Sequence, residues 1–350
     1  MARTGIVADP RYLDHDMGAF HVESPLRMQA ILDMLEDHPH PDRVDIAPRP
    51  AGEEEIRRVH NQGYFLTVRH TAGQEHVALD TDTLTSPRSF ETALLAAGGL
   101  IELTDKILDG TVRNGFAAVR PPGHHAEAGR AMGFCLFNNA AVAAEHLIRV
   151  RGLKRILILD WDLHHGNGTQ NTFLHRRDVL YFSIHQAPLF PGTGFWAETG
   201  IDEGEGFNLN LPFSPGKTDE DYLFAARELL GPVVEAFQPD FLLVSAGFDI
   251  AATDPLGGME ISSAGFGALT REIRDLADRC CEGRVAHVLE GGYDLPALRR
   301  GLDRVLQVLS GHDEASGIEA EASPLARKEI EPAARLWRKW WPLKPWKTAG

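Results

Sequence analysis

Cysteine is scarce in this sequence. Among 350 residues there are three cysteines, Cys135, Cys280 and Cys281, and the last two are adjacent. An odd number in this arrangement does not form a disulfide framework, and no Cys-x-x-Cys pair is present to bind zinc. We therefore expect the protein to occupy a reducing compartment.

Long apolar runs are missing as well. No stretch is long enough to cross a bilayer, and the first residues, MARTGIVADPRYL, lack the apolar centre of a secretory signal. These two absences predict a cytoplasmic protein that does not use a membrane as a partner.

Positive charge is in deficit. Lysine and arginine total 35 against 50 aspartates and glutamates, which gives a net charge of −15. Such a surface repels nucleic acid and anionic membrane, so we expect no nucleic-acid partner. The same field tolerates or attracts cationic substrates, such as polyamines or lysine-rich peptides. A hydrophobic content of 43% is typical of a soluble globular protein with a sizeable core.

Short β-rich runs alternate with longer helical patterns along the chain, as in an open, mostly parallel, doubly wound α/β sheet with helices on both faces. The runs expected as strands are 4–9, 115–120, 155–162, 179–185, 207–212, 241–249 and 284–292. The segments expected as helices are 24–35, 53–60, 63–70, 86–108, 138–150, 169–174, 219–237, 262–281 and 296–309. No internal repeat or long linker divides the chain, so we expect a single domain over 1–310.

The C-terminal segment 311–350 differs in character. It is first acidic and loop-like, and then carries four tryptophans among basic residues in RLWRKWWPLKPWK. We favour an extension whose rings pack on the domain, with a contact in a homo-oligomer or at a membrane surface as the alternative.

Polar side chains stand at the carboxyl ends of four of the predicted strands. In parallel sheets, ligands bind at these carboxyl ends. The residues are His124 and His125 after 115–120, Asp160, Asp162, His164, His165 and Asn167 at and after the end of 155–162, Asp249 at the end of 241–249, and Glu290, Tyr293 and Asp294 at and after the end of 284–292. Their convergence on one edge of the sheet predicts a functional site.

The segment DWDLHHGNGTQ (160–170) is the strongest candidate for a metal site. Asp162 and His164 stand at i and i+2, so on an extended segment their side chains leave the same face. A carboxylate and an imidazole suit Zn²⁺, and Asp249 is the natural third ligand, which leaves a position for water. Taken alone, Asp-x-His is more often a capped turn whose carboxylates are hydrogen-bonded.

Two other metal sites fit this segment poorly. A calcium-binding EF-hand loop needs glycine at its sixth position, where His165 stands when counting from Asp160. A dinuclear centre would need another carboxylate two residues past the metal-binding histidine, where Gly166 stands. A single metal ion is the more economical interpretation.

The pair His124–His125 and the phenol of Tyr293 each allow two interpretations. Adjacent histidines after Pro-Pro-Gly are ordinarily solvated surface groups, but beside a zinc-bound water they become a candidate acid and base. Tyr293 is ordinarily a half-buried tyrosine, but after two glycines its hydroxyl can reach the site and donate to a developing oxyanion.

The sequence resembles the zinc-dependent histone deacetylases and their bacterial relatives, which share the arginase/deacetylase fold. The motifs VRPPGHHAE, GFCLFNNAAVAA, DWDLHHGNGTQ, FPGTG, VSAGFDIAATDPLGG and LEGGYD occur in the family's order and span about residues 15 to 310. Their wording is similar to the class II branch.

The resemblance implies a role for each matching residue. It implies that Asp162, His164 and Asp249 bind Zn²⁺ and that His124, His125 and Tyr293 are catalytic, with Asp160 and Asn167 supporting the histidines. It further implies that Gly133, Phe134 and Phe190 line a narrow tunnel, that Asp82 holds the substrate backbone at the rim, and that Leu256 gates the tunnel. A monovalent cation site, filled by K⁺, would use Asp160, Asp162, His164, Ser183 and Ile184.

The two histidines should differ in charge. If His124 pairs with Asp160, the anion favours its imidazolium form. If His125 pairs with the neutral Asn167, that bias is missing, so we expect His125 to be the general base and then acid, with His124 in an electrostatic and orienting role.

Three functions remain to be distinguished. The first is a zinc amidohydrolase that removes acetyl or longer acyl groups from lysine side chains of proteins or peptides. The second is a deacetylase of acetylpolyamines or other small acetylamines, against which Leu256 counts because the family's polyamine-specific member has glutamate there. The third is a silent acyl-lysine-binding module, which would have lost a metal ligand or Tyr293, and all four residues are present.

Overall fold

The computed structural model describes residues 3–312 and 317–345. Its centre is an eight-stranded sheet of order β2-β1-β5-β10-β9-β6-β7-β8, in which every neighbouring pair is parallel. The strands are β1 (Thr4–Val7), β2 (Arg43–Asp45), β5 (Asn114–Ala117), β6 (Ile156–Asp160), β7 (Val179–Gln186), β8 (Asn208–Phe213), β9 (Phe241–Ala246) and β10 (Val285–Leu289). The expected parallel α/β fold is therefore confirmed.

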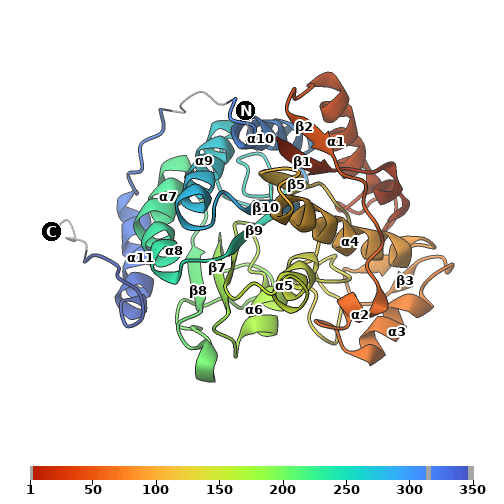
Figure 1. Ribbon diagram of the computed structural model, residues 1–350, viewed down its shortest axis with the longest axis horizontal. Coiled ribbons are helices and arrows are strands. Elements are labelled where there is room, and N and C mark those ends of the chain that lie inside the picture. The colour runs from red at the N-terminus through yellow and green to blue at the C-terminus, as the bar shows by residue number, and fades with distance from the viewer. Residues whose placement is uncertain (1–2, 313–316, 346–350) are drawn as a thin grey trace.

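Helices cover both faces of this sheet, as Figure 1 shows. On one face α1, α10, α9, α7 and α8 pack side by side, and on the other α4 packs on α5, and α5 on α6. The helices are α1 (Pro25–Asp37), α2 (Glu53–Ile56), α3 (Gln62–His70), α4 (Ser89–Leu108), α5 (Asn139–Arg149), α6 (Asn167–Phe173), α7 (Asp219–Ala225), α8 (Gly231–Phe237), α9 (Ser263–Cys280), α10 (Leu295–Leu309) and α11 (Pro324–Trp337). Because both faces are covered, the central strands are apolar and completely buried.

Several boundaries differ from the sequence-based expectation. The helix expected over 53–60 ends at Ile56, because Asn61 caps the next helix by accepting a hydrogen bond from the backbone N–H of Tyr64. The helix expected over 219–237 contains a π-helical turn, η3 (Ala226–Leu230), between α7 and α8. The short pair β3 (Val77–Ala78) and β4 (Leu84–Thr85), together with β2, was not expected.

Helix α11 packs against β8, the strand at one edge of the sheet. Trp337 is completely buried with its ring 5.6 Å from that of Phe182, and the indole N–H of Trp341 donates to the carbonyl of Gly206 at 2.8 Å. The fourth tryptophan, Trp346, lies outside the described residues. The assignment of 311–350 as an extension of a domain ending at residue 310 stays a prediction.

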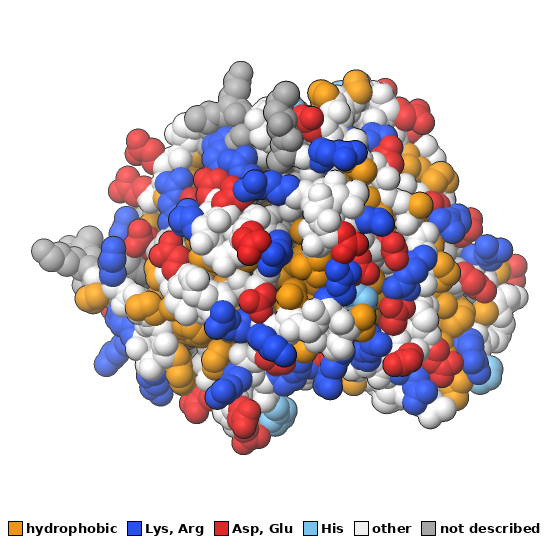
Figure 2. Space-filling model, in the orientation of Figure 1, with side chains coloured by type: hydrophobic (Ala, Val, Ile, Leu, Met, Phe, Trp, Pro, Cys, Tyr) orange, Lys and Arg blue, Asp and Glu red, His pale blue; other side chains and the backbone are white. Residues whose placement is uncertain are grey.

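The three cysteines are free thiols, and no helix within residues 3–312 and 317–345 has the length and hydropathy needed to span a membrane. On the face seen in Figure 2, basic and acidic side chains are interspersed over the helices.

Candidate active site

The sheet order brings the four polar strand ends together. β5, β10, β9 and β6 are consecutive neighbours at the centre of the sheet, so the loops that follow them share one edge. A cavity of about 190 Å³ lies at this edge. It is lined by Asp82, Pro122, His124, His125, Gly133, Phe134, His164, Phe190, Gly291 and Tyr293.

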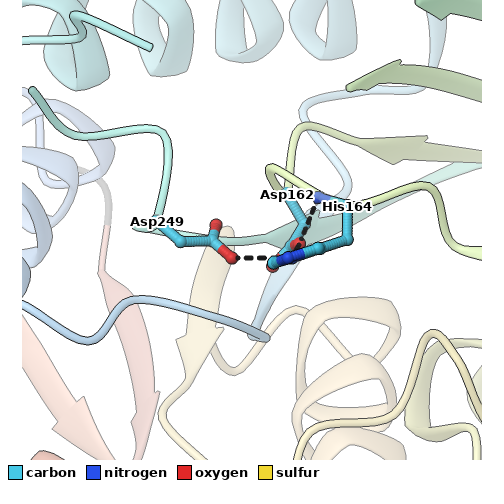
Figure 3. A group of neighbouring side chains, drawn as sticks. All are labelled: Asp162, His164 and Asp249. Atoms are coloured by element: carbon cyan, nitrogen blue, oxygen red, sulfur yellow. Dashed lines mark hydrogen bonds and ion pairs between the residues drawn. The ribbon is translucent and has the colours of Figure 1, made fainter. Parts of the chain in front are cut away.

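Asp162, His164 and Asp249 converge, as Figure 3 shows, and His164 also lines the cavity. Asp162 and His164 come from the loop after β6, and Asp249 comes from the loop after β9. One ligand atom of each residue lies within 4.8 Å of those of the other two. His164 Nδ1 lies 3.2 Å from Asp162 Oδ1 and 3.2 Å from Asp249 Oδ2.

Hydrogen bonds from the backbone hold the two carboxylates. Gly291 N–H donates to Asp162 Oδ2 at 2.8 Å, and Leu163 N–H donates to Asp249 Oδ1 at 3.0 Å. A Cβ atom at Gly291 would stand 2.2 Å from Asp249 Oδ2, so this close approach of backbone and carboxylate requires glycine.

These three residues fit a divalent metal ion. Among the described residues, no group makes a well-aligned hydrogen bond to the buried Asp249 Oδ2 atom, although His164 Nδ1 lies 3.2 Å away, and such a buried carboxylate oxygen is costly unless a cation faces it. Burial and the charge of Asp162 raise the pKa of Asp249 to about 7, and a positive ion would relieve this repulsion. One imidazole nitrogen and two carboxylate oxygens are a donor set that suits zinc.

His124 and His125 are both buried, yet the surroundings of His124 favour the charged imidazolium form and those of His125 favour the neutral form. Burial disfavours the charged form of His124, but Asp162 and Asp160 override it and raise its pKa to about 10. Its Nδ1 lies 3.0 Å from Asp160 Oδ2 and its Nε2 lies 3.6 Å from Asp162 Oδ1. Burial lowers the pKa of His125, and the charges of His124 and His164 lower it further.

Asp160 also accepts hydrogen bonds from Tyr181 and from the backbone of Asp162. Its Oδ2 atom accepts a hydrogen bond from the hydroxyl of Tyr181 at 3.0 Å, and its Oδ1 atom accepts one from the backbone N–H of Asp162 at 3.1 Å. Ser183 is its register partner on β7, and Ile184 follows in the same buried strand. These positions bring the residues expected at the potassium site together, and the ion itself stays a prediction.

Phe134 and Phe190 form walls of the cavity, with ring centroids 5.9 Å from Tyr293 and 5.1 Å from His125, respectively. Phe134 adopts a φ of 70°, which is uncommon for a residue with a side chain, and its N–H donates to the hydroxyl of Thr83 at 3.0 Å. Neighbouring Gly133 has a φ of 55° and packs directly on the His125 ring.

Asp82 and Leu256, which were expected around the tunnel, make hydrogen bonds within the protein, and their roles there stay predictions. Asp82 lines the cavity, but its Oδ1 atom already accepts hydrogen bonds from Gly133 N–H at 3.2 Å and from the hydroxyl of Thr83 at 2.9 Å. Leu256 is half-buried against the core and is not among the described residues that line the cavity. Its N–H donates a 3.0 Å hydrogen bond to Asp254 Oδ1.

Tyr293 is positioned by residues that the sequence analysis did not single out. The backbone N–H groups of Tyr293 and Asp294 both donate to Asp254 Oδ2, at 2.7 and 3.1 Å. The guanidinium of Arg27 lies over the Tyr293 ring, 4.9 Å from its centroid, and donates to the carbonyls of Glu290 and Gly292. The sequence carries one indication that Arg27 has a buried partner, because this charged residue lies on the apolar face of its helix.

Arg27 belongs to a buried ionic cluster. Glu23 accepts hydrogen bonds from Arg27 at 3.1 Å and from both Nε and Nη2 of Arg120, at 2.5 and 2.7 Å. Burial alone would raise the pKa of Glu23, but the two guanidinium groups hold it at about 2. His165, for which no specific role was expected, links Thr193 and Gln170 through its two ring nitrogens.

Comparison with known proteins places these residues in a family context. A family profile described as "Histone deacetylase domain" matches residues 21–309. Histone deacetylase 15 of Arabidopsis thaliana is 40% identical over 310 residues, which are 87% of this chain and 55% of that protein. A probable deacetylase of Archaeoglobus fulgidus is 38% identical over 91% of this chain and 89% of that protein.

A solved structure of a related domain has the same fold. The crystal structure of the HDA15 HD domain matches with a TM-score of 0.91 and 37% identity, covering 97% of this chain and 96% of that one. The chain spans about half of the length of histone deacetylase 15. It spans 43% of the length of histone deacetylase 4 of Caenorhabditis elegans, to which it is 36% identical.

Proposed function

Because the chain belongs to the histone deacetylase family, we propose that it is a zinc-dependent amidohydrolase that removes acetyl groups from lysine side chains of proteins or peptides. The observation that carries the proposal is the placement of Asp162, His164 and Asp249 beside a narrow cavity that His124, His125 and Tyr293 also border.

The cavity suits a long aliphatic side chain that ends in an amide. Its volume of about 190 Å³ and its aromatic walls, Phe134 and Phe190, match the methylene chain of lysine. An acyl-lysine side chain that enters between these rings brings its amide to the polar end of the cavity, where the histidines lie.

Asp162, His164 and Asp249 would hold the zinc ion. When bound there, zinc polarises the acetyl carbonyl and lowers the pKa of a water molecule towards neutrality. His125 is kept neutral by burial, so it can take a proton from the attacking water and later deliver it to the leaving lysine nitrogen.

His124 and Tyr293 stabilise the charge that develops during attack. His124 stays an imidazolium between Asp160 and Asp162 and adds positive charge next to the reacting carbon. Burial raises the pKa of the Tyr293 phenol, so its hydroxyl stays protonated and can donate to the developing oxyanion.

The test is a turnover panel with metal-depleted and zinc-restored enzyme. Acetyl-lysine peptides, longer acyl-lysine peptides and acetylpolyamines are the substrates. We expect acetate release from acetyl-lysine peptides that disappears on chelation and returns with zinc. Turnover of acetylpolyamines alone would replace the substrate class, and absence of zinc-dependent release from every substrate would contradict the proposal.

Zinc stoichiometry gives a second readout that does not depend on turnover. His164→Ala should abolish tight zinc binding, because one of three protein ligands is lost. His175→Ala is the matched control, since His175 is 60% exposed and pairs only with Asp202 among the described residues. It should bind zinc like the wild type.

A further inference from the structure

We propose that Glu127 is a positioning residue that fixes the tautomer of His125 through the side-chain amide of Asn167. The role of His125 as a proton acceptor belongs to the proposed function, so this inference rests on it. Hydrogen bonds connect the three side chains in a row, from Glu127 to Asn167 and from Asn167 to the ring of His125.

The contacts in this chain are short and directional. His125 Nδ1 lies 2.8 Å from Asn167 Oδ1, and Asn167 Nδ2 lies 2.7 Å from Glu127 Oε1. Asn167 is the first residue of α6 and is buried, so its amide sits between an imidazole and a carboxylate.

The carboxylate decides which end of the amide faces the histidine. An ionised carboxylate can only accept hydrogen bonds, so the NH₂ group of Asn167 must face Glu127. The amide oxygen then faces His125 Nδ1, which must donate. A neutral imidazole carries one N–H, so Nε2 of His125 holds the lone pair.

Reversal of the amide would remove the base. With its NH₂ group towards His125, Asn167 would require Nδ1 as an acceptor, and the ring proton would move to Nε2. A ring in that state has no lone pair left outside the Asn167 contact. The orientation that Glu127 selects is therefore the one that general-base chemistry needs.

Glu127 is itself held in place and kept charged. Arg130 donates to both of its oxygens, at 2.9 and 3.0 Å, and Asn171 donates to Oε1 at 3.0 Å. Burial alone would raise the pKa of Glu127, but these donors lower it. Its carbonyl accepts a hydrogen bond from the buried ring of His60 at 2.9 Å, which anchors the backbone.

The experiment compares three substitutions at Glu127 in the zinc-loaded full-length protein. Glu127→Lys replaces the acceptor by a donor and should reverse the Asn167 amide, lowering kcat for an acetyl-lysine peptide by ~10² or more while KM changes little. Glu127→Gln retains an oxygen that can accept from Asn167 and should keep most of kcat. Glu127→Ala removes the preference and should lose about 10-fold.

Arg130→Gln is the matched control. It removes the ion pair with Glu127 but leaves the contact between Glu127 and Asn167, so kcat should fall less than in Glu127→Ala. An equal loss of kcat in Arg130→Gln and Glu127→Lys would overturn the proposal, because a general disturbance of the loop would then explain both.

The tautomer itself can be observed by ¹⁵N NMR of histidine side chains, with His125→Gln used to assign the signals. We expect an Nδ1–H tautomer in the wild type and an Nε2–H tautomer in Glu127→Lys, or in Glu127→Ala as a partial shift if the lysine variant does not fold. An unchanged tautomer in the folded variants would overturn the inference. This readout is independent of turnover, so it separates failure of the inference from failure of the proposed function.

Discussion

Replacement of Gly133 by alanine should disable the site through one methyl group. A Cβ atom at this position would lie 2.3 Å from Cδ2 and 2.8 Å from Cγ of the His125 ring, and 3.0 Å from Cε1 of Phe190. Non-bonded carbon atoms prefer about 3.5–4.0 Å, so the methyl group and the ring must separate by more than about 1 Å. The φ of 55° at Gly133 adds about 1–2 kcal/mol for any residue with a side chain.

A displacement of about 1 Å in a reacting group can lower the rate by roughly 10². We therefore expect kcat for an acetyl-lysine peptide to fall by about that factor in Gly133→Ala. The zinc content should not change, because the atoms nearest to the new methyl group belong to His125 and Phe190 and not to a metal ligand.

Gly73→Ala separates the clash from the backbone strain. Gly73 has a comparable φ of 76°, but no atom lies within 4 Å of its ideal Cβ position. This variant should lose the same ~1–2 kcal/mol of unfolding free energy and keep its turnover. If Gly133→Ala turned over as fast as Gly73→Ala, the proposed dependence of catalysis on the position of the His125 ring would be refuted.

Three further predictions concern Tyr293, His60 and Trp337. Asp254→Ala frees the backbone N–H of Tyr293 and should lower kcat. In an enzyme that already carries Tyr293→Phe, the same substitution should lower kcat no further. Additive effects in this double-mutant cycle would contradict a role of Asp254 through Tyr293. Burial lowers the pKa of His60 to about 4, below its value of 6.5 in the unfolded chain. The neutral ring therefore stabilises the fold above pH 6.5, and the free energy of unfolding should fall by up to ~3 kcal/mol as the pH drops from 6.5 towards 4. Urea unfolding of His60→Gln should be less pH-dependent over this range, and an unchanged slope would speak against His60 as the source. Trp337→Ala should cost ~3–5 kcal/mol in chemical denaturation while the exposed Leu325→Ala on the same helix costs under ~1, and equal small losses would show that α11 contributes little.

The central part of the fold could be predicted from the sequence because its signals are local. Apolar runs such as 241–249 favour buried strands, and their alternation with helices favours a parallel sheet. The residues that follow four of these strands then had to lie at one edge, and the sheet order makes those four strands direct neighbours. For this reason the sequence alone pairs Asp249 with Asp162 and His164.

The contacts that position the site could not be predicted in the same way. Arg27 reaches the carbonyl of Gly292 across 265 positions of the sequence, and Asp254 holds the backbone of Tyr293 from a different loop. Such bonds depend on the conformation of loops, which hydrophobic periodicity does not encode. The hydrogen bond from Leu256 N–H to Asp254 Oδ1 is a contact of the same kind, and the role of Leu256 at the tunnel stays a prediction.

The positive charge proposed for His124 and the neutral state proposed for His125 follow from where their partners are attached. The two rings are covalent neighbours with centroids 4.0 Å apart, so a proton on both would be opposed by strong repulsion in a buried site. His124 meets Asp160 at the end of β6, whereas His125 meets Asn167 farther along the chain, at the start of α6. A carboxylate at one position and an amide at the other therefore assign the single positive charge to His124. If Asn167→Asp were made, the second carboxylate should draw a proton to His125 as well and lower kcat near neutral pH, and a variant with unchanged kcat and pH profile would show that the amide is not what keeps His125 neutral.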